Sequence, residues 1–152
     1  LVVVKERGNI PMKLLKIGDE VLVSGSKFEP VYSFGHYQPS ITSKYLHFRI
    51  QLSSSTTTTL TISKDHMIFV EGGNSIPASS IYIGSKLMLR NGDLGIVKSI
   101  KEIIEKGAYA PFTPSGTIVV NGVLSSTFVS FEGMHSLDLV GDLFSVPFQQ
   151  IA

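Results

Sequence analysis

Short apolar runs and polar turns alternate along the whole chain, and no stretch keeps the apolar spacing of an amphipathic helix for more than about three turns. Glycine and proline, 14 and 7 residues respectively, separate the runs. The clearest alternation covers residues 45–52, where every second side chain is a large apolar one: Leu46, Phe48, Ile50 and Leu52. Because alternate side chains of a strand share a face, this pattern predicts an all-β protein.

Turn-forming residues mark where the expected strands end. A strand is expected at 1–5, and another begins at Val31 and is expected to be broken by Gly35 and Pro39. The hydroxyl-rich stretch 53–59 is typical of the exposed tip of a hairpin. The chain therefore reads as short strands joined by tight turns.

Part of the sequence repeats itself. The pattern Ile-Pro followed by Gly occurs twice, 66 residues apart, at Ile10, Pro11 and Gly18 and again at Ile76, Pro77 and Gly84. The same spacing joins 31–34 to 97–100, and a spacing of 56 joins 61–68 to 117–124. Chance similarity in a sequence rich in Ile, Val and Gly is the alternative explanation, but a duplication is favoured because the Ile-Pro and Gly spacing is specific.

The duplication predicts two similar β subunits related by an approximate two-fold axis, packed as a compact disk with a cleft between them. The approximate halves are 10–70 and 76–128, within a single domain that covers residues 1–152. The last part, 133–152, carries apolar residues at roughly helical spacing and predicts a short C-terminal helical stub.

Composition narrows the possible functions. The chain has 152 residues, of which 43% are hydrophobic and 16% are charged, and a net charge of +1. Its basic residues form no stripe, so nucleic acid is not an expected partner. The apolar runs are too short for a transmembrane segment, and Leu1–Val4 is too short for the core of a signal peptide.

Cysteine is absent, so these residues hold no disulfide, no thiolate metal site and no thiol nucleophile. The four histidines are scattered without the paired spacing of a zinc site. We therefore expect neither a metal nor a cofactor.

One stretch, residues 60–70, combines candidate chemistry with a defined local geometry. A strand at 60–62 gives way to the polar residues 63–66, and an apolar run follows. Ser63 and His66 are three residues apart at this junction, so the hydroxyl and the imidazole can face one cleft. An imidazole can donate and accept protons near neutral pH. Alternatives remain open: Ser63 could cap its own backbone, and His66 could be a partly buried histidine without a catalytic role.

Three blocks of the sequence are distinctive. The most specific block joins residues 107–113 to residues 116–126, with the sequences Gly-Ala-Tyr-Ala-Pro-Phe-Thr and Gly-Thr-Ile-Val-Val-Asn-Gly-Val-Leu-Ser-Ser. Residues 15–22 and the spacing Ser63-x-x-His66 form the other two. These blocks resemble those of Hedgehog autoprocessing domains, which belong to the Hedgehog/intein (Hint) class. The resemblance covers about residues 1–128 and implies a Hint fold.

The resemblance also implies a function, namely self-cleavage. In this family a Cys at the start of the domain attacks the carbonyl before it, and an N-to-S acyl shift converts the peptide bond to a thioester. An alcohol, which is a sterol in Hedgehog proteins, or water then resolves the thioester. His66 would protonate the departing amide nitrogen. Ser63, where the family usually has Thr, would hydrogen-bond the scissile amide or orient His66.

The implied partners follow from this chemistry. The substrate would be the chain's own upstream segment, and the acceptor a sterol or another alcohol. The resemblance further suggests a monomer in the secretory pathway or outside the cell. Splicing is not expected, because the chain lacks the terminal His-Asn of a splicing intein.

Three positions depart from the family pattern. Aligned on Gly18, Leu1 falls about half a dozen residues after the family Cys, so the chain is expected to be truncated or inactive as given. Thr127 occupies the position of a second family Cys, and the simpler reading is a strand residue in the cleft. His36 stands where Hedgehog proteins place an Asp thought to activate the sterol. It could act as a general base, or could be an imidazole in a loop.

Two function hypotheses result. The first is a Hedgehog-type autoprocessing domain that acts once on its own chain. The second is a non-catalytic interaction module on a degenerate Hint scaffold. A stand-alone hydrolase finds no support, since no Gly-x-Ser-x-Gly motif is present.

Overall fold

The computed structural model describes residues 1–129 and 146–147, which form an all-β fold as the alternation predicts. Two single-turn 3-10 helices, η1 (Met12–Leu14) and η2 (Ala78–Ser80), interrupt the strands. The strands are β1 Val2–Val4, β2 Gly8–Ile10, β3 Glu20–Ser24, β4 Lys27–Pro30, β5 Ser33–Gln51, β6 Thr57–Ile62, β7 His66–Phe69, β8 Ser75–Pro77, β9 Lys86–Met88, β10 Leu94–Phe112, β11 Thr117–Val120, β12 Val123–Val129 and β13 Val146–Pro147.

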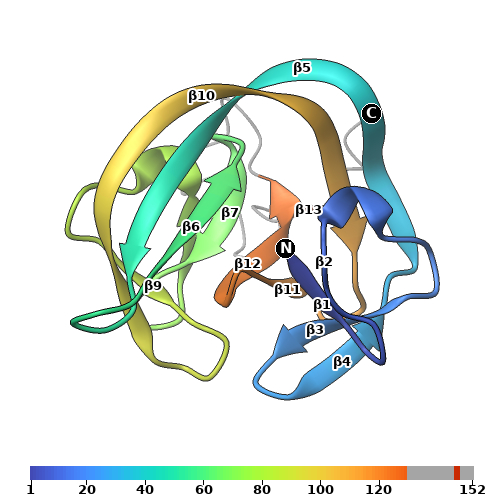
Figure 1. Ribbon diagram of the computed structural model, residues 1–152, viewed down its shortest axis with the longest axis horizontal. Helices are drawn as coiled ribbons and strands as arrows, with labels where there is room; N and C mark the ends of the chain where they lie inside the picture. Colours follow the sequence, from blue (N-terminus) through green and yellow to red (C-terminus); the bar gives the residue numbers. More distant parts are fainter. Residues whose placement is uncertain (130–145, 148–152) are drawn as a thin grey trace.

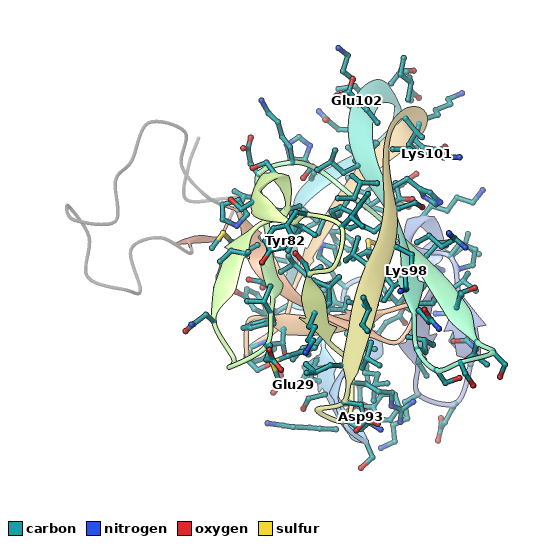
Figure 2. The ribbon with its side chains drawn as sticks, turned by 90° about the vertical axis from the view of Figure 1, so that its left-hand side faces the viewer. Glu29, Tyr82, Asp93, Lys98, Lys101 and Glu102 are labelled. Atoms are coloured by element: carbon teal, nitrogen blue, oxygen red, sulfur yellow. The ribbon has the colours of Figure 1, made fainter. Side chains whose placement is uncertain are left out.

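The strands form two sheets, of nine and of four strands. The main path of the larger sheet runs β4-β3-β1-β11-β12-β7-β8, with β2 beside β1 and β13 beside β12. The smaller sheet has the order β6-β5-β10-β9. Figure 1 shows β5 and β10 as a long curved ribbon that arches over the shorter strands. Lys98, Lys101 and Glu102 of β10 are charged and exposed (Figure 2).

The expectation that Gly35 and Pro39 break the strand after Val31 is wrong. β5 runs through both positions. Gln38 pairs with Ala108 and Thr42 pairs with Lys106, so three residues of β5 bulge opposite one residue of β10. A proline is tolerated in such a bulge because its missing N–H removes no regular ladder hydrogen bond.

The spacing of 66 residues reappears in the hydrogen bonds. Gly18 donates to the carbonyl of Val31 (2.8 Å), and Val31 donates to the carbonyl of Asp19 (2.9 Å). The same two bonds recur, at 2.8 and 2.9 Å, between Gly84, Val97 and Ser85. The glycines are needed because φ is +96° at residue 18 and +97° at residue 84, a region that other residues rarely adopt.

The strand pairing carries this correspondence to the first residues of the chain. Val2 pairs with Ile10 in the β1–β2 hairpin, and Ile68 pairs with Ile76 in the β7–β8 hairpin. The position directly before Leu1 is therefore the counterpart of His66. The structure thus extends the repeat beyond the residues from which it was inferred.

The second internal match, at a spacing of 56, has no counterpart in the sheets. β6 pairs with β5 in the smaller sheet, whereas β11 lies between β1 and β12 in the larger one. Although this spacing aligns His66 with Gly122, Gly122 is therefore not its structural counterpart. It follows Asn121 in a two-residue hairpin turn in which φ is +50° at Asn121 and +81° at Gly122, a geometry that favours the Asn-Gly sequence.

The core consists of two apolar clusters. One contains Phe48 and Ile50, which are fully buried as the alternation predicts, although Leu52 is 36% exposed. The other cluster is built from residues of the first 31 positions together with Ile118. Val120 packs against both clusters. Burial of each large side chain stabilises the fold by about 1.5–3 kcal/mol.

The helical stub expected at 133–152 lies outside the described residues, apart from Val146–Pro147. These two residues form β13 and pair with the end of β12.

Candidate active site

A cleft of about 330 Å³ opens where β6, β7, β10, β11 and β12 approach the first residue of the chain. Ser63, His66 and Thr127 all line it, as does Leu1. Three of the four residues singled out from the sequence are therefore brought together. Val120, the residue shared by the two apolar clusters, also lines the cleft, so the cleft lies where the two cores meet.

The turn between β6 and β7 positions two of these residues. β6 ends at Ile62, β7 begins at His66, and the backbone N–H of His66 donates to the carbonyl of Ser63 at 3.1 Å. The Ser63 hydroxyl makes no hydrogen bond within the part of the chain that the structure describes, so the backbone cap considered as an alternative is not formed. Its hydroxyl is left for a ligand or a substrate.

The imidazole of His66 is held by a contact that the sequence did not reveal. Its Nε2 lies 2.5 Å from the carbonyl oxygen of Ser126. Because a carbonyl only accepts, Nε2 carries the proton and donates, and Nδ1 is the proton-free nitrogen of the neutral ring. A bulge makes this possible: Ser125 pairs with Ile68 and Val129 with His66, so four steps along β12 face two along β7.

Burial lowers the pKa of His66 below its ordinary value of 6.5, and the hydrogen bond to Ser126 opposes this shift without cancelling it. The ring is therefore neutral at neutral pH. A neutral ring with Nδ1 free can first accept a proton and then donate it, which is the cycle of a general base that becomes a general acid.

Three consecutive side chains of β12 are buried at the cleft: Ser125, Ser126 and Thr127, at 3%, 2% and 2% exposure. The Ser126 hydroxyl accepts a hydrogen bond from the backbone of Phe128 at 3.0 Å. The hydroxyls of Ser125 and Thr127 are buried and have no hydrogen-bond partner among the residues described. Thr127 is thus a strand residue in the cleft, as the simpler interpretation of the sequence predicts. Its hydroxyl oxygen has no hydrogen-bond partner among the residues described.

His36 lines a second cleft, of about 490 Å³, together with Asp65. Ser63 and His66 line both clefts, so their turn forms a shared wall. The alternative of a loop imidazole is wrong, because His36 lies within β5 and pairs with Ala110. Each of the four candidate residues therefore lines at least one of two clefts that share this turn.

Tyr45, Gly107 and Tyr109 were not identified as site residues. The Tyr45 hydroxyl donates to the carbonyl of Gly107 at 2.6 Å. Burial, with Tyr109 and Glu105 nearby, raises the pKa of Tyr45. Gly107 has a φ of +99°, and a Cβ there would lie 2.8 Å from the Tyr109 ring. The signal was available, since Gly107 and Tyr109 belong to the most specific block of the sequence.

Asn121 clamps the first residue of the chain at the cleft. Its Oδ1 accepts from the Leu1 amine at 2.7 Å, and its backbone N–H donates to the Leu1 carbonyl at 2.9 Å. Its Nδ2 donates to the carbonyl of Thr59 at 2.7 Å. Asn121 was not predicted either, because its partners are distant in sequence.

The residues described contain no cluster of three or more His, Cys, Asp or Glu that could hold a metal ion. The same part of the chain contains no helix that is long and apolar enough to cross a membrane.

Comparisons with known proteins identify the family and the fold. A family model described as the Hint module matches residues 1–138. The Tiggy-winkle hedgehog protein of Danio rerio is 31% identical over 139 residues, which cover 80% of this chain and 32% of that protein. The Indian hedgehog protein of Xenopus laevis is 27% identical over 143 residues, covering 86% and 35%. The chain thus spans about a third of the length of these curated relatives.

Two solved structures show the same fold. The gp41-1 intein superposes with a TM-score of 0.64 at 19% identity, covering 82% of this chain and 92% of that chain. The Ssp DnaB mini-intein variant M86 superposes with a TM-score of 0.67 at 13% identity, covering 87% and 92%. With the family model matched over residues 1–138 and hedgehog proteins among its relatives, the chain belongs to the Hint family.

Proposed function

We propose that this chain is an autoprocessing domain that cleaves a peptide bond upstream of Leu1 in a longer protein, by an N-to-S acyl shift from an upstream Cys. The observation that carries the proposal is the state of His66. Its Nε2 is held by Ser126, its Nδ1 has no hydrogen-bond partner among residues 1–129, and it lies in the cleft where Leu1 begins. A segment that precedes Leu1 in a longer protein would therefore lie beside the imidazole of His66.

The residues suggest a sequence of proton transfers. Neutral His66 accepts the proton of the upstream thiol at Nδ1, and the thiolate adds to the carbonyl carbon of the preceding residue. The tetrahedral intermediate then breaks its C–N bond while His66 returns the proton to the departing amine. The product is a thioester, and the Ser63 hydroxyl orients the scissile amide or the imidazole.

The second cleft is a suitable place for the acceptor. It shares Ser63 and His66 with the first cleft, so an alcohol, a sterol among the candidates, or water can approach the thioester from the far side of the turn. His36 would take the acceptor's proton as its oxygen attacks, and the thiolate would leave. By the resemblance to hedgehog proteins, we place the reaction in the secretory pathway and in a monomer.

The experiment is expression of the chain preceded by its natural upstream residues. Purified precursor treated with a small thiol is expected to release the upstream fragment, detected by mass spectrometry, and a His66→Ala precursor is expected to stay intact. Addition of a sterol tests the acceptor, since the fragment would gain the mass of the sterol ester. An intact wild-type precursor after thiol treatment would overturn the proposal.

A second candidate function is a non-catalytic interaction module, favoured by the absence of any cysteine from these 152 residues. The upstream sequence separates the two. An upstream Cys together with thiol-induced cleavage supports autoprocessing, and an upstream segment without Cys supports the module.

A further inference from the structure

Two buried hydroxyl groups in the cleft lack a partner. Ser125 Oγ and Thr127 Oγ1 make no hydrogen bond within residues 1–129, although their side chains are only 3% and 2% exposed. Both residues line the cleft that also contains His66 and Leu1. A buried hydroxyl without a partner lowers the free energy of unfolding. Two such hydroxyls, separated by a single residue, therefore require an explanation.

The two hydroxyls flank the anchor of the acid–base group. Ser125 and Thr127 lie on either side of Ser126 in the bulged part of β12, and both line the cleft. Between them, the carbonyl of Ser126 accepts the Nε2–H of His66. Because His66, Ser125 and Thr127 line the same cleft, a substrate bound there would lie near all three side chains.

The chemistry of the missing partner can be inferred. Both residues line the cleft, so a substrate bound in the cleft can supply the missing partner. The substrate in this cleft is a polypeptide backbone, because Asn121 clamps Leu1 at the cleft. The backbone atom that takes two hydroxyl donors is a carbonyl oxygen, which has two lone pairs.

We propose that Ser125 and Thr127 form an oxyanion hole for the scissile carbonyl. The proposal rests on the proposed function and adds the group that stabilises its intermediate. When the thiolate adds to the carbonyl carbon, the π electron pair moves to oxygen, and both hydroxyls donate to that oxyanion. When the intermediate breaks down, the pair re-forms the C=O bond and the amine leaves with the proton from His66. Shielding from water strengthens such hydrogen bonds in the charged intermediate.

This role predicts effects of opposite sign on stability and on rate. Ser125→Ala and Thr127→Val remove hydroxyls without partners, so in the 152-residue chain they leave the free energy of unfolding unchanged or raise it, as measured with urea. In the precursor, each slows thiol-induced cleavage by about 100-fold, the loss typical of one oxyanion donor. Thr127→Ser keeps the hydroxyl and retains the rate to within a few fold.

Thr113→Val is the matched control. The Thr113 side chain is equally buried, at 2% exposure, but its hydroxyl donates to the carbonyl of Thr117 at 2.7 Å, and it does not line the cleft. Its loss lowers the free energy of unfolding and leaves the cleavage rate of the folded precursor unchanged.

The outcomes separate the two proposals. A wild-type precursor that cleaves, with Ser125→Ala and Thr127→Val precursors that cleave equally fast, overturns the oxyanion hole and leaves autoprocessing in place. If Ser125→Ala and Thr127→Val lower the free energy of unfolding as Thr113→Val does, the two hydroxyls have a structural role, which would also overturn the oxyanion hole. An ester of the upstream fragment on Thr127, found by mass spectrometry, would show a nucleophile instead. A wild-type precursor that never cleaves overturns the proposed function itself.

Discussion

The Nε2 nitrogen of His66 donates a hydrogen bond to the carbonyl oxygen of Ser126, a residue sixty positions away on a bulged strand. This contact sets the tautomer of the imidazole, because a carbonyl can only accept. It leaves Nδ1 for substrate, and it forms at the bulge of β12 between Ser125 and Val129. His66 is therefore the central side chain of the proposed chemistry in the cleft.

Replacement of His66 by Ala is predicted to slow cleavage of the precursor by about 100- to 10,000-fold, the usual contribution of a general acid–base group. The measurement is the single-turnover rate of fragment release after addition of thiol. His47→Ala is the matched control, because His47 bonds the Thr61 hydroxyl and lines neither cleft. Equal rates in the two variants would remove His66 from the mechanism.

The stability of the chain is predicted to depend on pH through His66. Burial holds its pKa below 6.5 in the folded state, so between the folded pKa and 6.5 the unfolded chain binds more protons than the folded chain. The contribution of His66 is therefore fully present above about pH 6.5 and is lost as the pH falls toward the folded pKa. Urea unfolding at several pH values should show a larger acid loss in wild type than in His66→Gln, whereas equal losses would contradict the burial of the ring.

Asn121→Gly is predicted to slow cleavage without much loss of stability. Glycine keeps the positive φ of the turn but removes the side-chain bonds to Leu1 and Thr59, so the upstream segment is aimed less well at His66. We expect a reduction of about 10-fold, with an unchanged pH profile, since no titrating group is altered. Asn91→Gly, in an Asn-Gly turn that does not line either cleft, should leave the rate unchanged. A similar loss in both variants would assign the effect to the turns rather than to positioning.

Gly107→Ala is predicted to destabilise the chain by about 1–3 kcal/mol or more, because the backbone is in the left-handed region and the new Cβ would meet the Tyr109 ring. Gly92→Ala separates the two causes, since φ is +88° there and no atom lies within 4 Å of the Cβ position. Urea unfolding should give a larger loss at Gly107 than at Gly92. Equal losses would mean that the contact with Tyr109 carries no cost.

Local signals in the sequence predicted the fold well. Alternation identified Phe48 and Ile50 as core residues, and the recurring glycines at 18 and 84 marked two equivalent turns that require positive φ. The spacing of Ser63 and His66 across a strand junction also predicted the candidate site, because a tight turn is enough to bring these two side chains together.

Contacts between distant segments could not be predicted in the same way. Ser126 holds His66 through its backbone carbonyl, and every residue has such a carbonyl. The identity of residue 126 therefore does not indicate this role. Pro39 suggested the end of a strand. The bulge that accommodates this proline depends on pairing with β10, which the residues around Pro39 do not reveal. The alignment of Gly122 with His66 at a spacing of 56 was misleading, because Gly122 is a glycine for the sake of a hairpin turn with positive φ.

The most direct test of the central claim is to trap the thioester. The precursor, with its natural upstream residues, is incubated with hydroxylamine, and the released fragment is weighed. The account predicts a hydroxamate at the C-terminus of the fragment from wild type, formed much more slowly from His66→Ala. A precursor that yields no hydroxamate, or yields it equally fast with and without His66, would contradict the account.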